Sequence, residues 1–264
     1  MPVRQTETTI TAEGPSRVVV RITAVTPHGP TQDGIVGFAA TVEFADPDVV
    51  PFIAGDLVFG VTGGQGIAVG SQVSLEAEHI CGRPRSIPSD IAARLARNAV
   101  IAWLALFERL AMETATDNEL ALVEAGDEQL GLLLVRLLQR LTKVDVIVGA
   151  GDVGPWRSVL RPDRDEFAPD CEALVAILKK EARTPRYLVL AGDPRSRVFD
   201  LNDIVSLFQQ GIGAVRVLDL AWISNVGWLT VARSRFAISD ILAELKPIFE
   251  TEAQALFELC PQTT

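Results

Sequence analysis

The chain has 264 residues, of which 48% are hydrophobic, with a formal net charge of −10 and a mean hydropathy of +0.26. That apolar content can fill a sizeable core, the acidic balance argues against nucleic acid as a partner, and no run of about 18 apolar residues predicts a membrane span. Three widely spaced cysteines and two histidines form neither a disulfide framework nor a metal-binding pattern, so we expect no metal site and a cytoplasmic location.

Residues 1–88 are predicted to form a β-rich, barrel-like unit. Short alternating or β-branched stretches, separated by glycine and proline turns, are typical of strands. The stretches are Arg17–Val25, Gly37–Glu43, Asp56–Val61 and Gly66–Leu75. The glycine cluster 63–66 most simply forms a hairpin turn.

After Pro84 and Pro88 the apolar period becomes helical. Ser89 or Asp90 is a plausible N-cap residue for this helix. One apolar face is formed by Ile91, Leu95, Val100, Ile101, Leu104 and Phe107.

From about residue 119 the predicted strands and helices alternate, a rhythm that indicates βαβ units and a parallel sheet. The strands are Leu120–Glu124, Val144–Val148, Tyr187–Leu190 and Ala214–Leu220. The helices are Leu130–Leu141, Glu172–Glu181, Asn202–Gln210 (stopped by Gly211) and a last amphipathic stretch, Asp240–Leu259, that contains Pro247. The fold class is therefore α/β, with regions 1–88, 89–235 and 236–264.

Several segments resemble the medium-chain dehydrogenase/reductase superfamily. Val18–Val25 resembles its opening strand, Gly37–Phe44 its "aGvVtevG" strand, Ala54–Gly60 its "vGDrVfG" segment, and Ile101–Glu108 its "tAwyAL" helix. Over roughly residues 16–150 the chain is most similar to enoyl reductase domains of fungal highly reducing polyketide synthases and to their quinone-reductase relatives. The resemblance implies a GroES-like, β-barrel-type substrate domain followed by a Rossmann-like parallel-sheet domain, in shortened form.

Within this resemblance, the cofactor loop "hAAaGGVG" falls on Glu124–Gly131. Its glycine pair falls on Glu128 and Gln129, and its preceding small residue on Asp127, so that only Gly131, which allows close helix packing, remains. Like charges about 4 Å apart at an effective dielectric constant of about 20 repel by about 4 kcal/mol, enough to offset most of a micromolar affinity. We therefore predict a vestigial cofactor site that binds no NADPH. It consists of Gly126, Asp127, Glu128, Gln129, Leu130 and Gly131.

A second loop, Gly149–Gly154, matches the G-x-G-x-x-G pattern by letter. The helix after it is too short for a dinucleotide fold, and Asp163–Asp170 does not read as a strand. The resemblance places this loop at the adenosine 2′-phosphate of NADPH. There, beside Gly151, Asp152 would repel the phosphate and Arg157 would partly offset the repulsion.

The sequence also offers no clear candidates for the residues that would catalyse enoyl reduction. The loop 26–34 lacks the helix that carries the acid-bearing segment of the resembling family. Tyr187, the only tyrosine, has the pattern of a sheet-core residue. His28 is a conceivable proton donor, but a lone histidine in a proline- and glycine-containing loop more often faces solvent. We predict no catalytic residue.

The preferred interpretation is a catalytically silent, enoyl-reductase-like domain or protein of polyketide biosynthesis with an architectural or docking role. Its expected partners are other polyketide synthase domains or a separate, trans-acting reductase. The sequence leaves open whether the chain forms a homodimer. The chain stops soon after its last predicted helix, which leaves the implied substrate domain incomplete or the chain a fragment. The alternatives are an active NADPH-dependent enoyl or quinone reductase with an atypical loop, and a methyltransferase-like nucleotide module built on Gly149–Gly154.

Overall fold

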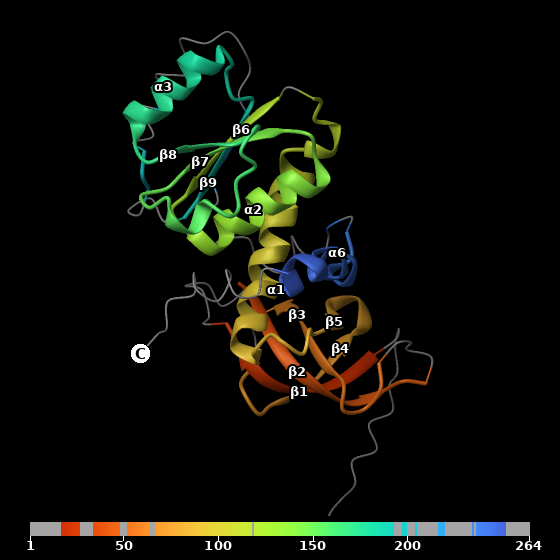
Figure 1. Ribbon diagram of the computed structural model, residues 1–264. Coiled ribbons are helices and arrows are strands. Elements are labelled where there is room, and N and C mark those ends of the chain that lie inside the picture. Colours follow the sequence, from red (N-terminus) through yellow and green to blue (C-terminus); the bar gives the residue numbers. More distant parts are fainter. Residues whose placement is uncertain are drawn as a thin grey trace, which may run out of the picture.

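Two sheets of five strands each form the two ends of the molecule, and helices lie between them (Figure 1). The computed structural model describes residues 17–26, 34–47, 52–63, 67–117, 119–192, 197–199, 204, 216–219, 234 and 236–251. The first sheet is antiparallel and the second is parallel, which confirms the predicted mixed α/β fold.

The antiparallel sheet has the strand order β4-β1-β2-β3-β5. Its strands are β1 (Arg17–Val25), β2 (Ile35–Ala45), β3 (Leu57–Gly63), β4 (Gln72–Glu76) and β5 (Ile80–Gly82). Alternate residues of β1, such as Val18 and Val20, are buried in one core cluster with Phe38 and Val58 of the neighbouring strands. This alternation matches the period of two that a half-buried strand requires.

The predicted strand over residues 66–75 is shorter than expected. The chain turns at Ala68–Ser71, where the Ser71 hydroxyl donates to the Ala68 carbonyl over 2.6 Å, and Gly70 has a φ of +86°. Because that backbone conformation does not continue a strand, β4 begins only at Gln72.

Helix α1 (Ser89–Trp103) continues into a π-helical turn over Leu104–Arg109, and the predicted apolar face is buried. The predicted N-cap is wrong, because Pro88 occupies that position and makes no side-chain cap bond. The Ser89 hydroxyl instead accepts a hydrogen bond of 2.7 Å from Arg83, and Asp90 pairs with Arg94.

The parallel sheet has the strand order β10-β9-β6-β7-β8. Its strands are β6 (Leu120–Ala125), β7 (Asp145–Gly149), β8 (Glu166–Ala168), β9 (Tyr187–Ala191) and β10 (Arg216–Asp219). The chain starts at the central strand β6, moves outward to β7 and β8, and returns to the other side of β6 with β9. The strand order therefore reverses between β6 and β9, which is where open α/β sheets bind ligands.

Strand β8 corrects the prediction that Asp163–Asp170 contains no strand. Glu166, Phe167 and Ala168 pair in parallel with Ile147, Val148 and Gly149 of β7. The segment is only three residues long and begins with a charged residue, so sequence periodicity carries too little signal to identify it.

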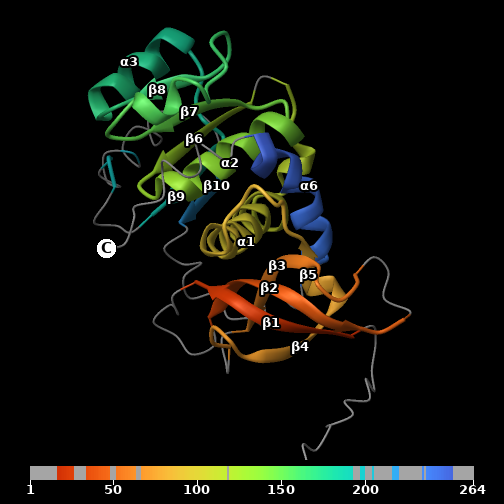
Figure 2. The ribbon, with the colours of Figure 1, turned by 60° about the horizontal axis from the view of Figure 1, so that its bottom comes forward.

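Helices cover both faces of the parallel sheet (Figure 2). Helix α2 (Glu128–Leu141) lies between this sheet and α1, and α3 (Cys171–Glu181) lies on the outer face. Helix α6 (Ile238–Thr251) packs on α1, β3 and β5, and one continuous apolar core joins α1, α2 and α6. Residues 252–259 of the predicted last helix, and all of 202–210 except Ile204, lie outside the described residues, as do residues 64–66 of the predicted hairpin turn.

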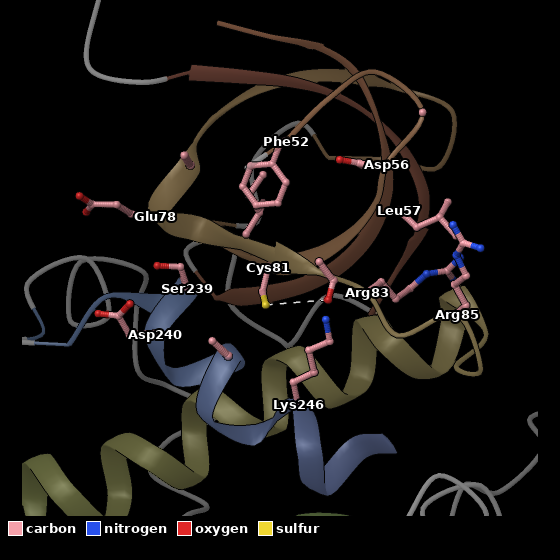
Figure 3. Close-up of a pocket in the computed structure, with 15 residues that line it drawn as sticks. Phe52, Asp56, Leu57, Glu78, Cys81, Arg83, Arg85, Ser239, Asp240 and Lys246 are labelled. Carbon is pink, nitrogen blue, oxygen red and sulfur yellow. Dashed lines mark hydrogen bonds between the residues drawn. The ribbon is translucent and has the colours of Figure 1, made fainter. Parts of the chain in front are cut away.

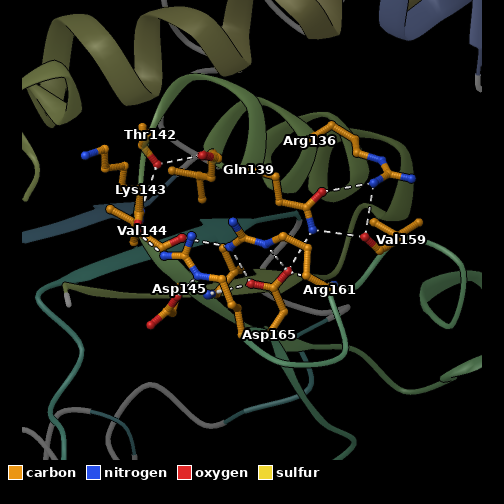
Figure 4. Close-up of polar contacts among 12 residues, drawn as sticks. Arg136, Gln139, Thr142, Lys143, Val144, Asp145, Val159, Arg161 and Asp165 are labelled. Atoms are coloured by element: carbon orange, nitrogen blue, oxygen red, sulfur yellow. Dashed lines mark hydrogen bonds and ion pairs between the residues drawn. The ribbon is translucent and has the colours of Figure 1, made fainter. Parts of the chain in front are cut away.

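A buried polar cluster holds the connection from β7 to β8, which has only a short 3-10 turn, Gly154–Trp156, in place of a long helix (Figure 4). The buried carboxylate of Asp165 accepts hydrogen bonds from Arg161 at 2.7 and 2.8 Å, from Gln139 at 2.8 Å and from the Val146 amide at 3.1 Å. Burial raises the pKa of this carboxyl, but the hydrogen bonds from Arg161 and Gln139 outweigh burial and leave the pKa lowered.

Among the described residues, no helix combines the length and the apolar character that crossing a bilayer requires.

Candidate functional site

The first loop joins the carboxyl end of β6 to the start of α2. Asp127 is its N-cap residue: the Asp127 carboxylate accepts a hydrogen bond of 3.0 Å from the Leu130 amide, and the Asp127 carbonyl accepts one of 2.8 Å from the Gly131 amide. Glu128 follows in the first turn, where a carboxylate interacts favourably with the helix dipole. The chain's own acids therefore occupy the helix N-terminus that a dinucleotide would approach.

Gly131 lies where α2 packs directly on β6. A Cβ atom at this position would be 2.5 Å from the Ala125 Cβ and 3.3 Å from the Trp156 ring. No side chain fits there without moving the helix. The packing role that the resemblance gives to this glycine is thus visible in the contacts.

Gln129 is buried and faces α1. Its side-chain oxygen accepts a hydrogen bond of 2.9 Å from the amide nitrogen of Asn98, which is also buried. The resemblance aligns Gln129 with a loop glycine, a position at which a side chain would fill the space of a diphosphate. The structure instead places the Gln129 side chain in the interface between α1 and α2.

The first loop touches the end of β9 at the point where the strand order reverses. The Asp127 amide donates a hydrogen bond of 2.7 Å to the Ala191 carbonyl. Gly192 follows with a φ of +139°, and a Cβ atom there would lie 2.7 Å from both the Asp127 nitrogen and the Gly126 carbonyl carbon. An incoming diphosphate would have to separate these two backbone segments before it could reach the Asp127 amide.

Glu124, the last-but-one residue of β6, is fully buried. One carboxylate oxygen accepts a hydrogen bond of 2.8 Å from the Val198 amide, and the other has no hydrogen-bond partner among the described residues. Burial raises the pKa of this carboxyl, while the backbone of Val198, the charge of Arg197 and the backbone of Gly126 oppose the rise. Sequence reasoning gave Glu124 no role, although a lone acid in an apolar strand is a usable signal.

Residues 197–199 are held at the same edge of the sheet. Arg197 pairs with Asp219, at the end of β10, over 2.5 Å. The ring of Phe199 lies against Gly149, where an added Cβ atom would come within 2.1 Å of it. Residues 197–199 are therefore anchored to the carboxyl ends of β6, β7 and β10.

The second loop is also occupied by its own side chain. The Asp152 carboxylate accepts a hydrogen bond of 2.8 Å from the Gly154 amide. Gly151, Asp152 and Arg157 are exposed, and space for a Cβ atom remains at Gly151. Of Gly149, Gly151 and Gly154, Gly149 is the one whose close contact, with the ring of Phe199, leaves no room for a side chain.

Tyr187 lies at the opposite edge of the parallel sheet. The Tyr187 hydroxyl, at the amino end of β9, donates a hydrogen bond of 2.9 Å to Glu119. His28 lies outside the described residues. Within the described ranges, no three histidine, cysteine or acidic side chains are placed to hold a metal ion.

A cavity of about 880 Å³ lies away from both loops, between the antiparallel sheet and α6 (Figure 3). None of the predicted site residues lines it. Sequence reasoning did not identify this cavity, because its walls come from segments more than 150 residues apart.

No family model matches the sequence, and no curated protein matches it either. Solved structures do match its fold. An alcohol dehydrogenase superfamily protein of Novosphingobium aromaticivorans is 19% identical, with 90% of this chain and 80% of that chain covered and a TM-score of 0.57. The CurK enoyl reductase is 13% identical, with 95% and 83% covered and a TM-score of 0.58. A Bacillus thuringiensis protein described as an NADPH:quinone reductase is 18% identical, with 92% and 81% covered and a TM-score of 0.55.

These structural neighbours are medium-chain dehydrogenases/reductases, and the chain has a shortened form of that architecture. At such low identity the likeness concerns the fold.

Proposed function

We propose that the protein is a catalytically silent member of the enoyl-reductase class, in which the Rossmann-like sheet is retained without a working dinucleotide site. The observation that carries the proposal is the hydrogen bond from the Asp127 amide to the Ala191 carbonyl. It uses a backbone donor of the first loop and joins the two strand ends between which a diphosphate would lie.

The charges at this loop support the same conclusion. Asp127 and Glu128 place two carboxylates at the start of α2, and Glu124 lies buried behind them. Neither Arg nor Lys replaces the missing glycines. The residues present therefore do not fit a bound diphosphate, and we derive no reaction step through a dinucleotide.

We further propose that the role is architectural, in the cytoplasm, within polyketide biosynthesis. Its partners would be other polyketide synthase domains or a trans-acting reductase that supplies the reduction. The sequence resemblance to enoyl reductase domains of such synthases supports this part of the proposal.

The competing function is an active NADPH-dependent enoyl or quinone reductase whose first loop opens on binding. The fold shared with the CurK enoyl reductase and with the Bacillus thuringiensis protein favours it. Binding would then have to break the Asp127–Ala191 contact.

An activity assay separates the two functions. The purified chain is incubated with NADPH and a crotonyl thioester, and NADPH oxidation is followed by absorbance beside a medium-chain enoyl reductase of known activity. The proposal predicts no oxidation above the protein-free rate, both for the natural sequence and for the Asp127→Ala/Glu128→Gly/Gln129→Gly variant. Turnover by the natural chain would refute the proposal, and turnover by the variant alone would show that only the loop is defective.

A further inference from the structure

The cavity between the antiparallel sheet and α6 has the size of a small-molecule site. Its volume of about 880 Å³ lies within the range of about 300–1,000 Å³ that is common for ligand pockets. Its apolar lining comes from both sides of the cavity, with Phe52, Leu57, Ala77 and Ile80 from the sheet unit and Ala243 from α6. Such a lining suits an apolar ligand body.

Charged groups are divided between the two sides of this cavity. Glu78 and Asp240 lie on one side, whereas Arg83 and Arg85 lie on the other (Figure 3). Asp56 also lines the cavity, on the side of Leu57, and its carboxylate accepts a hydrogen bond of 2.9 Å from the Ile53 amide. Lys246 extends from α6 toward Cys81 between the two groups. A ligand with one negative charge near the cations, and no second one at the far side, is the best match for this arrangement.

Lys246 is the most informative of the cations. Lys246 is partly exposed, its ammonium nitrogen would lie 4.0 Å from a Cβ atom placed on Gly82, and within the described part of the chain it forms no ion pair or hydrogen bond. A positive charge beside a cavity, with no counter-charge among the described residues, attracts an anionic group. An anionic ligand group would supply that counter-charge.

Arg83 adds a second positive charge to the wall. One terminal nitrogen donates to the Ile87 carbonyl and the Ser89 hydroxyl, which fixes the guanidinium, while the buried Nε atom has no partner among the described residues. Arg85 is exposed beside it. The positive charge of Arg83 is therefore held in the cavity wall by contacts at the start of α1.

We propose that this cavity binds a small monocarboxylate with an apolar tail, with the carboxylate paired to Lys246 and the tail against Phe52 and Ile80. The site is separate from the two glycine loops and does not depend on whether the Rossmann-like sheet binds a dinucleotide. A coenzyme-type polyanion fits poorly, because Glu78 and Asp240 would repel its further charges.

Cys81 provides a direct readout, because its half-buried thiol lines the cavity. The full chain is treated with iodoacetamide, and modification of each cysteine is measured by peptide mass spectrometry. Cys171, at the start of α3 on the other sheet, serves as the internal reference. The probes are octanoate, octan-1-ol and octylammonium, which share one tail and differ in charge.

Octanoate is expected to slow the alkylation of Cys81 several-fold, to leave Cys171 unaffected, and to bind with a dissociation constant below about 1 mM by calorimetry. Lys246→Gln should weaken octanoate binding at least about tenfold, whereas Lys246→Arg should retain it. Lys180→Gln is the matched control, since Lys180 is an exposed lysine of α3 paired with Glu166, and it should change nothing.

Equal protection by octan-1-ol or octylammonium would overturn the proposal, because the cationic side would then select no anion. Absence of protection by octanoate, or binding that Lys246→Gln leaves unchanged, would overturn it as well. Circular dichroism and thermal unfolding identify a misfolded variant, and in that case Lys246→Arg and the comparison of the three probes on the natural chain decide the question.

Discussion

The backbone amide of Asp127 donates to the carbonyl of Ala191 over 2.7 Å, and this contact joins the first loop after β6 to the end of β9. In open α/β sheets these two strand ends normally separate to admit a ligand. Here the separation is absent, and Gly192 allows the close approach because a Cβ atom would meet the backbone of Gly126 and Asp127.

Gly192→Ala tests this close approach. Gly192 has a φ of +139°, and an added Cβ atom would lie 2.7 Å from the Asp127 nitrogen, so strain and a backbone clash act together. We expect a loss of about 2 kcal/mol or more in the free energy of unfolding, measured by urea denaturation. The control is Gly151→Ala, where nothing lies within 4 Å, and its change should stay within about 0.5 kcal/mol. Equal stability of the two variants would contradict the observed contact.

Glu124→Gln tests the buried carboxyl under the first loop. Burial raises the folded-state pKa of Glu124, so its contribution to stability is complete below the unfolded-state pKa and is lost as pH rises through the folded-state value. The variant lacks this titration. Its unfolding free energy relative to the natural chain should therefore increase from pH 5 to pH 8, by at most about 1.4 kcal/mol per pH unit.

The matched control for this pH series is Glu172→Gln, at the exposed start of α3. Its difference from the natural chain should not vary over the same pH range. A constant difference for Glu124→Gln as well would show that the buried carboxyl does not titrate in the expected direction.

Asp165→Asn tests the buried cluster that replaces a crossover helix between β7 and β8. Removing the charge leaves Arg161 without its buried partner, which should cost about 3 kcal/mol at pH 7. The folded-state pKa of Asp165 is lowered, so its contribution is present above the unfolded-state pKa and is lost as pH falls through the folded-state value.

The difference between the natural chain and Asp165→Asn should accordingly stay constant from pH 7 to about pH 4.5 and shrink only below about pH 4, as urea denaturation across this range would show. Asp163→Asn, at an exposed position two residues earlier, serves as the control and should be neutral. A difference for Asp165→Asn that already declines between pH 7 and pH 5 would contradict the lowered pKa.

The arrangement of strands and helices was largely predictable, because it follows from local periodicity. The period of two in β1 and the apolar face of α1 are both visible in the sequence and both are buried in the structure. The N-cap of α1 was not predictable, since Arg83 takes the Ser89 hydroxyl from outside the helix. Strand β8 was missed because it is short and is stabilised by pairing with β7.

The candidate site was predictable only where its residues are neighbours in the chain. Asp127 and Glu128 at the start of α2 follow from local sequence. The contacts Asn98–Gln129, Glu124–Val198 and Asp127–Ala191 join residues more than 30 positions apart. No spacing rule gives such contacts without the packed fold, and the same holds for the cavity at Lys246.

The most direct measurement is a titration of the purified chain with NADPH, followed by the fluorescence of its four tryptophans and by calorimetry. Trp156 packs close to Gly131 beneath the first loop, so it reports on ligand binding there. We predict no saturable change up to about 1 mM NADPH, under conditions in which an active medium-chain reductase binds the cofactor. Saturable one-to-one binding with a dissociation constant below about 100 µM would contradict the account.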